Sequence, residues 1–168
     1  MDSKEVIKSQ YRATLEMLGS TVSKCPDTLW DDSTYKNRFW HVAYHALFFA
    51  HLYLHEREKE FVAWKRHRKE YQFLGPLPWP PHTKPRIGES YTKEEVLEYL
   101  ALCREEVEAR VPSLDLGAES GFSWLPFTKL ELQFYNIRHI QHHTGELIGR
   151  LRSREDIPVR WIAMKGLD

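Results

Sequence analysis

The chain has 168 residues and no formal net charge, because 24 Lys and Arg residues balance 24 Asp and Glu residues. This length suits one domain, and 42% hydrophobic residues supply material for one core, so we expect a single domain over residues 1–168. Zero net charge removes the electrostatic basis for nucleic-acid binding. No uncharged stretch reaches the roughly 20 apolar residues of a membrane span. We therefore expect neither a nucleic-acid nor a membrane partner.

The N-terminus and the cysteines bear on the compartment. The first residues, MDSKEV, contain no apolar segment typical of a secretory signal. Cys25 and Cys103 form no CxxC motif and are too few for a disulfide framework. We therefore expect a cytoplasmic protein with reduced cysteines.

The first half of the chain predicts two long helices. Apolar residues recur at helical spacing over residues 3–22, with Asp2 or Ser3 as the expected N-cap, and Pro26 ends this pattern. A second helix is expected from Asp32 or Ser33, either of which can cap it, to about Glu58. Its middle is apolar on nearly every face, which is typical of a central or interface helix.

A long irregular connection follows the second helix. Its first part, residues 57–71, is charged and could extend a helix, whereas residues 76–85 contain five of the nine prolines. Such a proline cluster is incompatible with helix or sheet. Trp79 among the prolines suggests that the segment packs onto the body of the protein, and a connection of this length usually has a functional or interface role.

The second half of the chain predicts two further helices. Thr92 with Glu95, and Thr128 with Glu131, have the spacing of capping boxes, and each pair precedes an apolar stripe of helical period. Pro112 ends the third helix, and the fourth continues to about Ser153. The fold class is therefore expected to be all-α, a four-helix bundle with a long proline-rich connection between the second and third helices.

Histidines are unusually frequent and clustered. The chain has nine, and three pairs have the spacing i,i+4, where composition alone would give about 0.4 such pairs. This spacing places two side chains on one helix face. The pairs are His41/His45, His51/His55 and His139/His143.

On the fourth helix, five polar residues fall within about a third of the circumference; they are Asn136, His139, His143, Glu146 and Arg150. One interpretation is a solvent-exposed stripe. The other is a metal site facing the bundle interior, because neutral imidazole binds zinc, nickel, copper and iron, and bundles build such sites from facing helices.

The second helix supplies a third imidazole for such a site. His45 lies within the apolar run, where an unpaired buried imidazole would cost on the order of 1–3 kcal/mol, and with His139 and His143 it favours a ligand set over an isolated core histidine. Glu146, one turn beyond His143, could orient an imidazole, act as a general base or be a fourth ligand. His41, His51 and His55 are interpreted as packing or surface residues.

The segment 136–147 (NIRHIQHHTGEL), with Trp40 and His45 upstream, resembles the DinB-like metalloenzyme family. In that family one histidine of the second helix and an H-x-x-x-H pair on the last helix bind a divalent metal. The resemblance covers most of the chain and implies that His45, His139 and His143 are the ligands of a divalent metal. Three imidazoles accept zinc, nickel or iron, and we expect zinc or nickel first, with iron as a further candidate. It also implies a homodimer.

Two departures from the family pattern affect the surroundings of the metal: Thr144 stands where Arg is common, and Glu146 where Gln is usual. The resemblance implies no single reaction, because relatives include thiol S-transferases and a thiol-dependent isomerase. The leading hypothesis is a metal-dependent enzyme acting on a small molecule, of thiol S-transferase or hydrolase type, with a low-molecular-weight thiol as a candidate partner. Trp40, Tyr44, Trp124 and Tyr135 are expected to wall its pocket.

The alternative hypothesis is a non-catalytic stress-response or binding module. In it the metal is structural, or the histidines form a buried polar cluster without metal. An open coordination position beside a cavity would favour the enzyme, and a closed site of four ligands would favour the module.

Overall fold

The computed structural model describes residues 2–163, and this part of the chain is all-α, with no β-strand. Five α-helices make up the fold: α1 (Ser3–Lys24), α2 (Asp27–Trp30), α3 (Phe39–Leu52), α4 (Lys93–Arg110) and α5 (Lys129–Glu155). Two short 3₁₀ turns, η1 (Glu58–Glu60) and η2 (Val111–Ser113), lie in the connections. No helix of the described residues is both long and apolar enough to cross a membrane.

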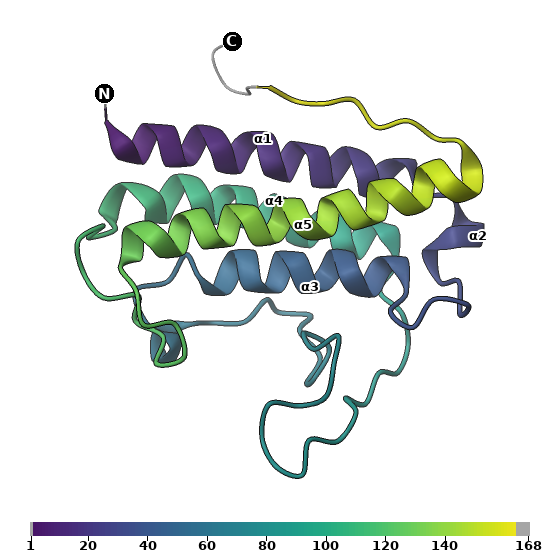
Figure 1. Cartoon of the computed structure of the whole chain (residues 1–168), viewed down its shortest axis with the longest axis horizontal. Helices are drawn as coiled ribbons and strands as arrows, with labels where there is room; N and C mark the ends of the chain where they lie inside the picture. The colour runs from purple at the N-terminus through teal and green to yellow at the C-terminus, as the bar shows by residue number, and fades with distance from the viewer. Residues whose placement is uncertain (1, 164–168) are drawn as a thin grey trace.

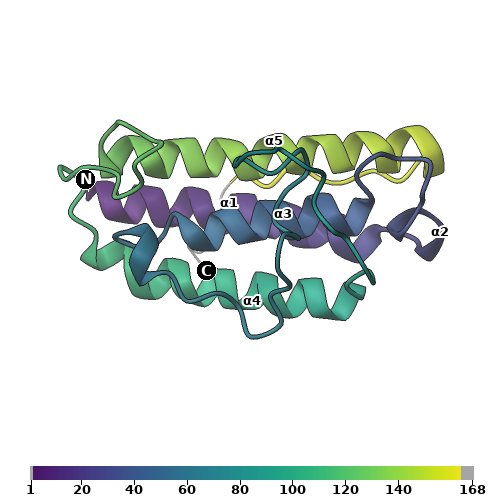
Figure 2. The same ribbon diagram turned by 90° about the horizontal axis from the view of Figure 1, so that it is seen from below.

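The four longer helices lie side by side around one core. Helix α1 packs against α4 and α5, and α3 packs against the same two helices on the opposite side (Figures 1 and 2). Every residue of α3 except His45 and Phe49 is buried, which confirms that this helix is central. Its apolar middle is covered by neighbours within one chain, so α3 is not free to form a dimer seam.

The starts of the helices agree with the capping signals. The Asp2 carboxylate accepts a hydrogen bond from the backbone N–H of Lys4 at 2.9 Å and caps α1. Thr92 and Glu95 form the complete reciprocal capping box of α4. At α5 the Thr128 hydroxyl accepts from the N–H of Glu131 at 3.3 Å, so one half of the expected box is present.

The second predicted helix is wrong at both ends. Residues 31–38 form turns instead of a helix: Asp32 accepts from the N–H of Thr34 at 2.9 Å, and Asp31 accepts from the Arg38 guanidinium at 2.7 Å. These side-chain bonds compete with helix formation. The helix also ends at Leu52 instead of continuing to residue 58, and the region 61–71 is not helical.

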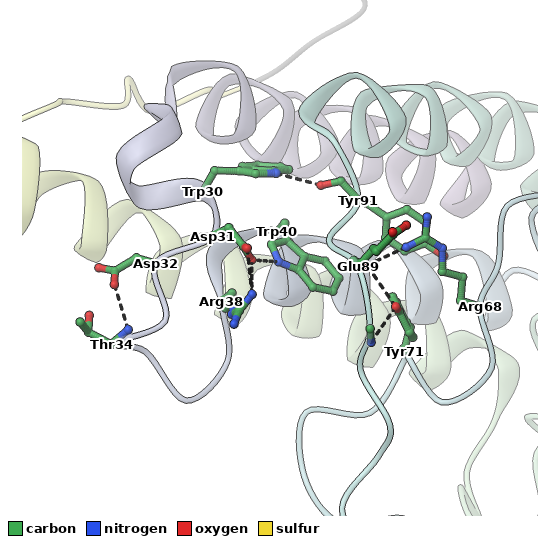
Figure 3. Close-up of polar contacts among 11 residues, drawn as sticks. Trp30, Asp31, Asp32, Thr34, Arg38, Trp40, Arg68, Tyr71, Glu89 and Tyr91 are labelled. Carbon is green, nitrogen blue, oxygen red and sulfur yellow. Dashed lines mark hydrogen bonds and ion pairs between the residues drawn. The ribbon is translucent and has the colours of Figure 1, made fainter.

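The two ends of the proline-rich connection are tied to each other, and its C-terminal end is tied to α2, as Figure 3 shows. The Tyr71 hydroxyl donates to the carbonyl of Glu89 at 3.0 Å, which closes the base of the loop. The Trp30 indole donates to the carbonyl of Tyr91 at 2.9 Å, just before α4. Trp79 is 48% exposed and its ring contacts Phe73 within the same connection, so it does not pack into the body as expected.

At Gly121 the segment before α5 comes close to the backbone of the segment after α3, and substitution of this glycine tests that contact. Gly121 has φ +83°, and a Cβ there would lie 1.9 Å from the carbonyl oxygen of Glu56. We expect Gly121→Ala to lower the free energy of unfolding by about 3 kcal/mol, through backbone strain and overpacking, as measured by urea denaturation.

The matched control is Gly149→Ala in α5, where an added Cβ meets nothing within 4 Å. Better helix propensity is expected to raise stability there by about 1 kcal/mol. Equal effects of the two substitutions would contradict the predicted strain at Gly121.

Candidate metal centre

Three imidazoles from two helices converge at the interface of α3 and α5. One ring nitrogen from each of His45, His139 and His143 lies within 4.8 Å of the others. The Nε2 atoms of His45 and His139 are 3.1 Å apart, close to the about 3.3 Å between two nitrogen ligands of tetrahedral zinc with Zn–N bonds of 2.0–2.1 Å. The structure therefore brings together the three histidines that the sequence predicted as ligands.

The protein orients the imidazole of His45 through the long connection. The Nδ1 atom of His45 lies 2.6 Å from the carbonyl oxygen of Gln72. A carbonyl oxygen can only accept, so Nδ1 carries the proton and Nε2 presents its lone pair toward His139 and His143. One turn earlier, His41 Nε2 donates to the carbonyl of Tyr71 at 2.8 Å. The connection is thus held against α3 at two consecutive carbonyls.

Glu146 orients His143 from the opposite side. Its carboxylate accepts from His143 Nδ1 at 3.4 Å and also pairs with the Arg150 guanidinium. Glu146 is not in the group of three converging ligand atoms in the described chain. Of the three roles expected for Glu146, this geometry favours the orienting one. Glu146 accepts from His143 Nδ1 and so leaves the His143 Nε2 atom free for a metal.

Burial keeps these imidazoles neutral. Desolvation holds the pKa of His45 well below its ordinary value and lowers the pKa of His139 to about 4, with the neighbouring His143 adding to the effect. Burial also lowers the pKa of His143, against the opposing effect of Glu146. Neutral imidazole is the form that binds metal. His139 Nδ1 is buried and has no hydrogen-bond partner among the described residues, so the protein alone does not satisfy this ring.

Most of the polar stripe of α5 faces inward, so the interpretation as a solvent-exposed stripe is wrong; of its five residues only Glu146 is exposed. Asn136 is fully buried, and its amide donates to the Tyr11 hydroxyl at 2.9 Å and to the carbonyl of Ala50 at 3.1 Å. Arg150 is also buried and donates to the carbonyl of Asn37 at 2.8 Å. These bonds fix the rotation of α5 that aims His139 and His143 at α3.

A cavity lies beside His139, which is the one histidine of the centre that lines it. This cavity of about 230 Å³ is lined by Tyr135, Arg138, His139 and His142. The Tyr135 ring lies parallel to that of His139, with their centroids 6.4 Å apart. Of the four aromatic residues expected around the pocket, only Tyr135 lines this cavity in the described chain, because Trp40 and Tyr44 are fully buried in the core. Trp124 contacts Phe122.

A second group of ligand-type side chains lies between α3 and α4. His51, His55 and Glu106 also have ligand atoms within 4.8 Å of one another. The sequence had assigned His51 and His55 to packing or surface positions, and both are buried. Their i,i+4 spacing was a signal, but Glu106 comes from a separate helix and carries no sequence pattern of its own.

Substitution of Glu146 tests its orienting role. Glu146→Gln keeps the shape of the side chain but removes the charge that accepts from His143 Nδ1–H. We expect zinc affinity at this centre to fall about 10-fold or more, as measured by competition with a chromophoric chelator. Glu131→Gln, an exposed carboxylate in the first turn of the same helix, serves as the control, and equal affinities of the two variants would contradict the role.

Comparison with known proteins agrees with this geometry. The sequence model of the DinB superfamily matches residues 10–147, a span that contains α3 with His45 and the part of α5 with His139 and His143. No curated protein and no solved structure matches the chain. Because the match covers most of the sequence, the chain belongs to the DinB superfamily.

Proposed function

We propose that this protein is a metal-dependent enzyme in which His45, His139 and His143 hold one divalent ion that acts on a small molecule. The observation that carries the proposal is the convergence of three neutral imidazoles beside a cavity. Three protein ligands with a remaining open position are typical of catalytic zinc sites, whereas structural sites are usually closed by four. We also propose that α1, α3, α4 and α5 form a four-helix bundle as a single domain over residues 1–168.

The surrounding residues have distinct roles in this proposal. The ion would supply Lewis-acid chemistry, by which a coordinated water or thiol loses its proton near neutral pH. The Gln72 carbonyl and Glu146 hold two imidazoles in the orientation that binding requires. Tyr135 shields one side of the cavity, and the Arg138 guanidinium lies 5.6 Å from the centre of its ring.

The lining of the cavity suggests the substrate class. Arg138 is exposed and lies beside His139 at the cavity, where its guanidinium can bind a carboxylate in a bidentate manner. This favours a small anionic molecule, such as a low-molecular-weight thiol with a carboxylate group, and thiol transfer to an electrophile as the reaction. Hydrolysis of a small substrate by a coordinated water is the second candidate, favoured by the three-imidazole ligand set.

We further propose a homodimer, with the N-terminal half of α5 at its interface. Leu130 and Phe134 are exposed at i,i+4 on α5, and Trp124 is exposed shortly before the helix. Large apolar side chains grouped on a surface are typical of interfaces. Light scattering should give a dimer mass for the native protein and a monomer mass for Phe134→Glu. An unchanged mass would contradict this interface.

Metal loading and activity of matched variants test the proposal. The double variant His139→Ala/His143→Ala should lose about one equivalent of bound zinc or nickel relative to the native protein, and with it any thiol-transfer or hydrolytic activity. His142→Ala removes an exposed histidine from the same helix and should retain the metal. Equal metal content in all three proteins would refute the centre. Metal binding without activity, in screens against thiol and hydrolytic substrates, would favour the non-catalytic module.

A further inference from the structure

Like the first group, the second group of ligand-type side chains brings three possible metal ligands together from two parts of the fold. His51 lies in the last turn of α3, His55 follows in the turn after it, and Glu106 faces them from α4. His51 Nε2 is 3.9 Å from a carboxylate oxygen of Glu106, and the His51 and His55 rings are 5.1 Å apart between centroids. Two imidazoles and a carboxylate are a common zinc ligand set.

His55 presents an unpartnered nitrogen to this group. Its Nδ1 atom donates to the carbonyl of His51 at 3.0 Å, so the proton is on Nδ1 and Nε2 has a free lone pair. Nε2 is buried and has no hydrogen-bond partner within residues 2–163, and the whole residue is only 1% exposed. A buried acceptor without a donor is costly, and a cation bound to Nε2 would satisfy it.

The imidazole of His51, the other histidine of this group, is also held through its Nδ1 atom. His51 Nδ1 lies 3.2 Å from the hydroxyl of Tyr99, another buried residue. A hydroxyl can either donate or accept, and in the tautomer that donates from Nδ1 to Tyr99 the Nε2 atom of His51 is also a free ligand atom that faces Glu106. Metal-binding histidines typically donate their second ring nitrogen to such a partner, and here both histidines have one.

The backbone of His55 is held in place by a buried lysine. The Lys129 ammonium donates to the carbonyl of His55 at 3.0 Å and to that of Glu56 at 2.9 Å, and it also bonds to the carbonyl of Ser120. Three carbonyls on one ammonium leave the turn little freedom. The group is therefore organised before any ligand binds, which lowers the entropic cost of binding.

The group opens onto solvent. It lines a cavity of about 500 Å³ whose walls carry charges of both signs, with Glu98 and Glu105 balanced by Lys65 and Arg110. Glu106 pairs with Arg110 through Oε2, the same oxygen that lies 3.9 Å from His51 Nε2. A carboxylate offers about four lone-pair positions, so Oε1 and the second lone pair of Oε2 remain for a cation. Competition from the Arg110 charge should make this site weaker than the first.

We propose that His51, His55 and Glu106 form a second site for a divalent transition-metal ion, between α3 and α4. It is separate from the first centre, because His45 and His51 are six residues apart, about 9 Å along the helix axis, and their partners lie on α5 and α4 respectively. The two sites therefore do not form a binuclear cluster, whose ions would be about 3.5–4 Å apart.

Titration with cobalt(II), followed by its visible absorption and by calorimetry, tests the second site without any enzymatic assay. The native protein should bind about two equivalents, and His139→Ala/His143→Ala should retain about one, with a spectrum of its own. Adding His55→Gln to that double variant should abolish the remaining binding, and adding Glu106→Gln should weaken it at least about 10-fold. Adding Glu94→Gln, an exposed carboxylate in the first turn of α4 that does not line this cavity, should leave it unchanged.

The outcomes separate the two sites. Circular dichroism and urea denaturation first establish that each variant is folded, and a variant that is not folded is replaced by His51→Gln in the same background. A double variant that binds no cobalt while folded overturns the second site but leaves the first intact. Retained binding in the double variant that is insensitive to His55→Gln and Glu106→Gln also overturns it. If His139→Ala/His143→Ala binds as much cobalt as the native protein, and adding His55→Gln abolishes that binding, the second site is established and the first is refuted.

Discussion

Lowering the pH from 7 to 5 is expected to destabilise the metal-free protein by about 4 kcal/mol. Burial lowers the pKa of His51 and of His139 to about 4 in the folded chain, from 6.5 when they are exposed. Between these values the unfolded chain binds more protons than the folded one, so acid favours unfolding. Each group contributes about 2 kcal/mol over this pH range, and the lowered pKa of His45 acts in the same direction.

Urea denaturation in the presence of a chelator at pH 7, 6 and 5 measures this effect. Carboxylates titrate mostly below this range, so the histidines dominate the change. The free energy of unfolding should change between pH 7 and pH 5 by about 2 kcal/mol less in His51→Gln than in the native protein. This expectation does not depend on the stability of the variant at pH 7. A native protein whose stability changes by less than 1 kcal/mol over the range would contradict the predicted burial of these neutral imidazoles.

Replacing Lys129 with Met is expected to lower the free energy of unfolding by about 4 kcal/mol. Lys129 has no solvent-exposed surface, and its ammonium is the donor to three carbonyls in two separate loops. Met fills a similar volume but donates nothing, so the carbonyls of His55, Glu56 and Ser120 would lose this donor, at about 1–3 kcal/mol for each that stays buried and unpaired.

Lys24→Met is the matched control for this substitution. The exposed Lys24 ammonium donates to the carbonyl of Pro158 at 2.7 Å, where water can replace it, so a change within about 0.5 kcal/mol is expected. Thermal and urea denaturation of both variants measure the difference. Similar stabilities of the two variants would show that the three carbonyls find other partners.

Local sequence signals were sufficient for most helix boundaries. Asp2 and Thr92 cap α1 and α4 as their spacing predicted, because capping is a contact between residues two or three positions apart and needs no tertiary structure. The second helix could not be delimited in this way. Its N-terminal boundary depends on bonds from Asp31 to Arg38 and Trp40, and its C-terminal boundary is followed by the turn that Lys129 holds from the far end of the chain.

The sequence by itself determined the all-α class and the family, and it predicted the grouping of His45, His139 and His143. Helical periodicity places His139 and His143 on one face, and the resemblance to the DinB-like family adds His45 to them. Only the tertiary structure decided which ring nitrogens are free. The Gln72 carbonyl and Glu146 take one nitrogen each of His45 and His143. It likewise decided that His51 and His55 meet Glu106. A hydrogen bond between residues distant in sequence depends on how the helices pack, and no local pattern records that packing.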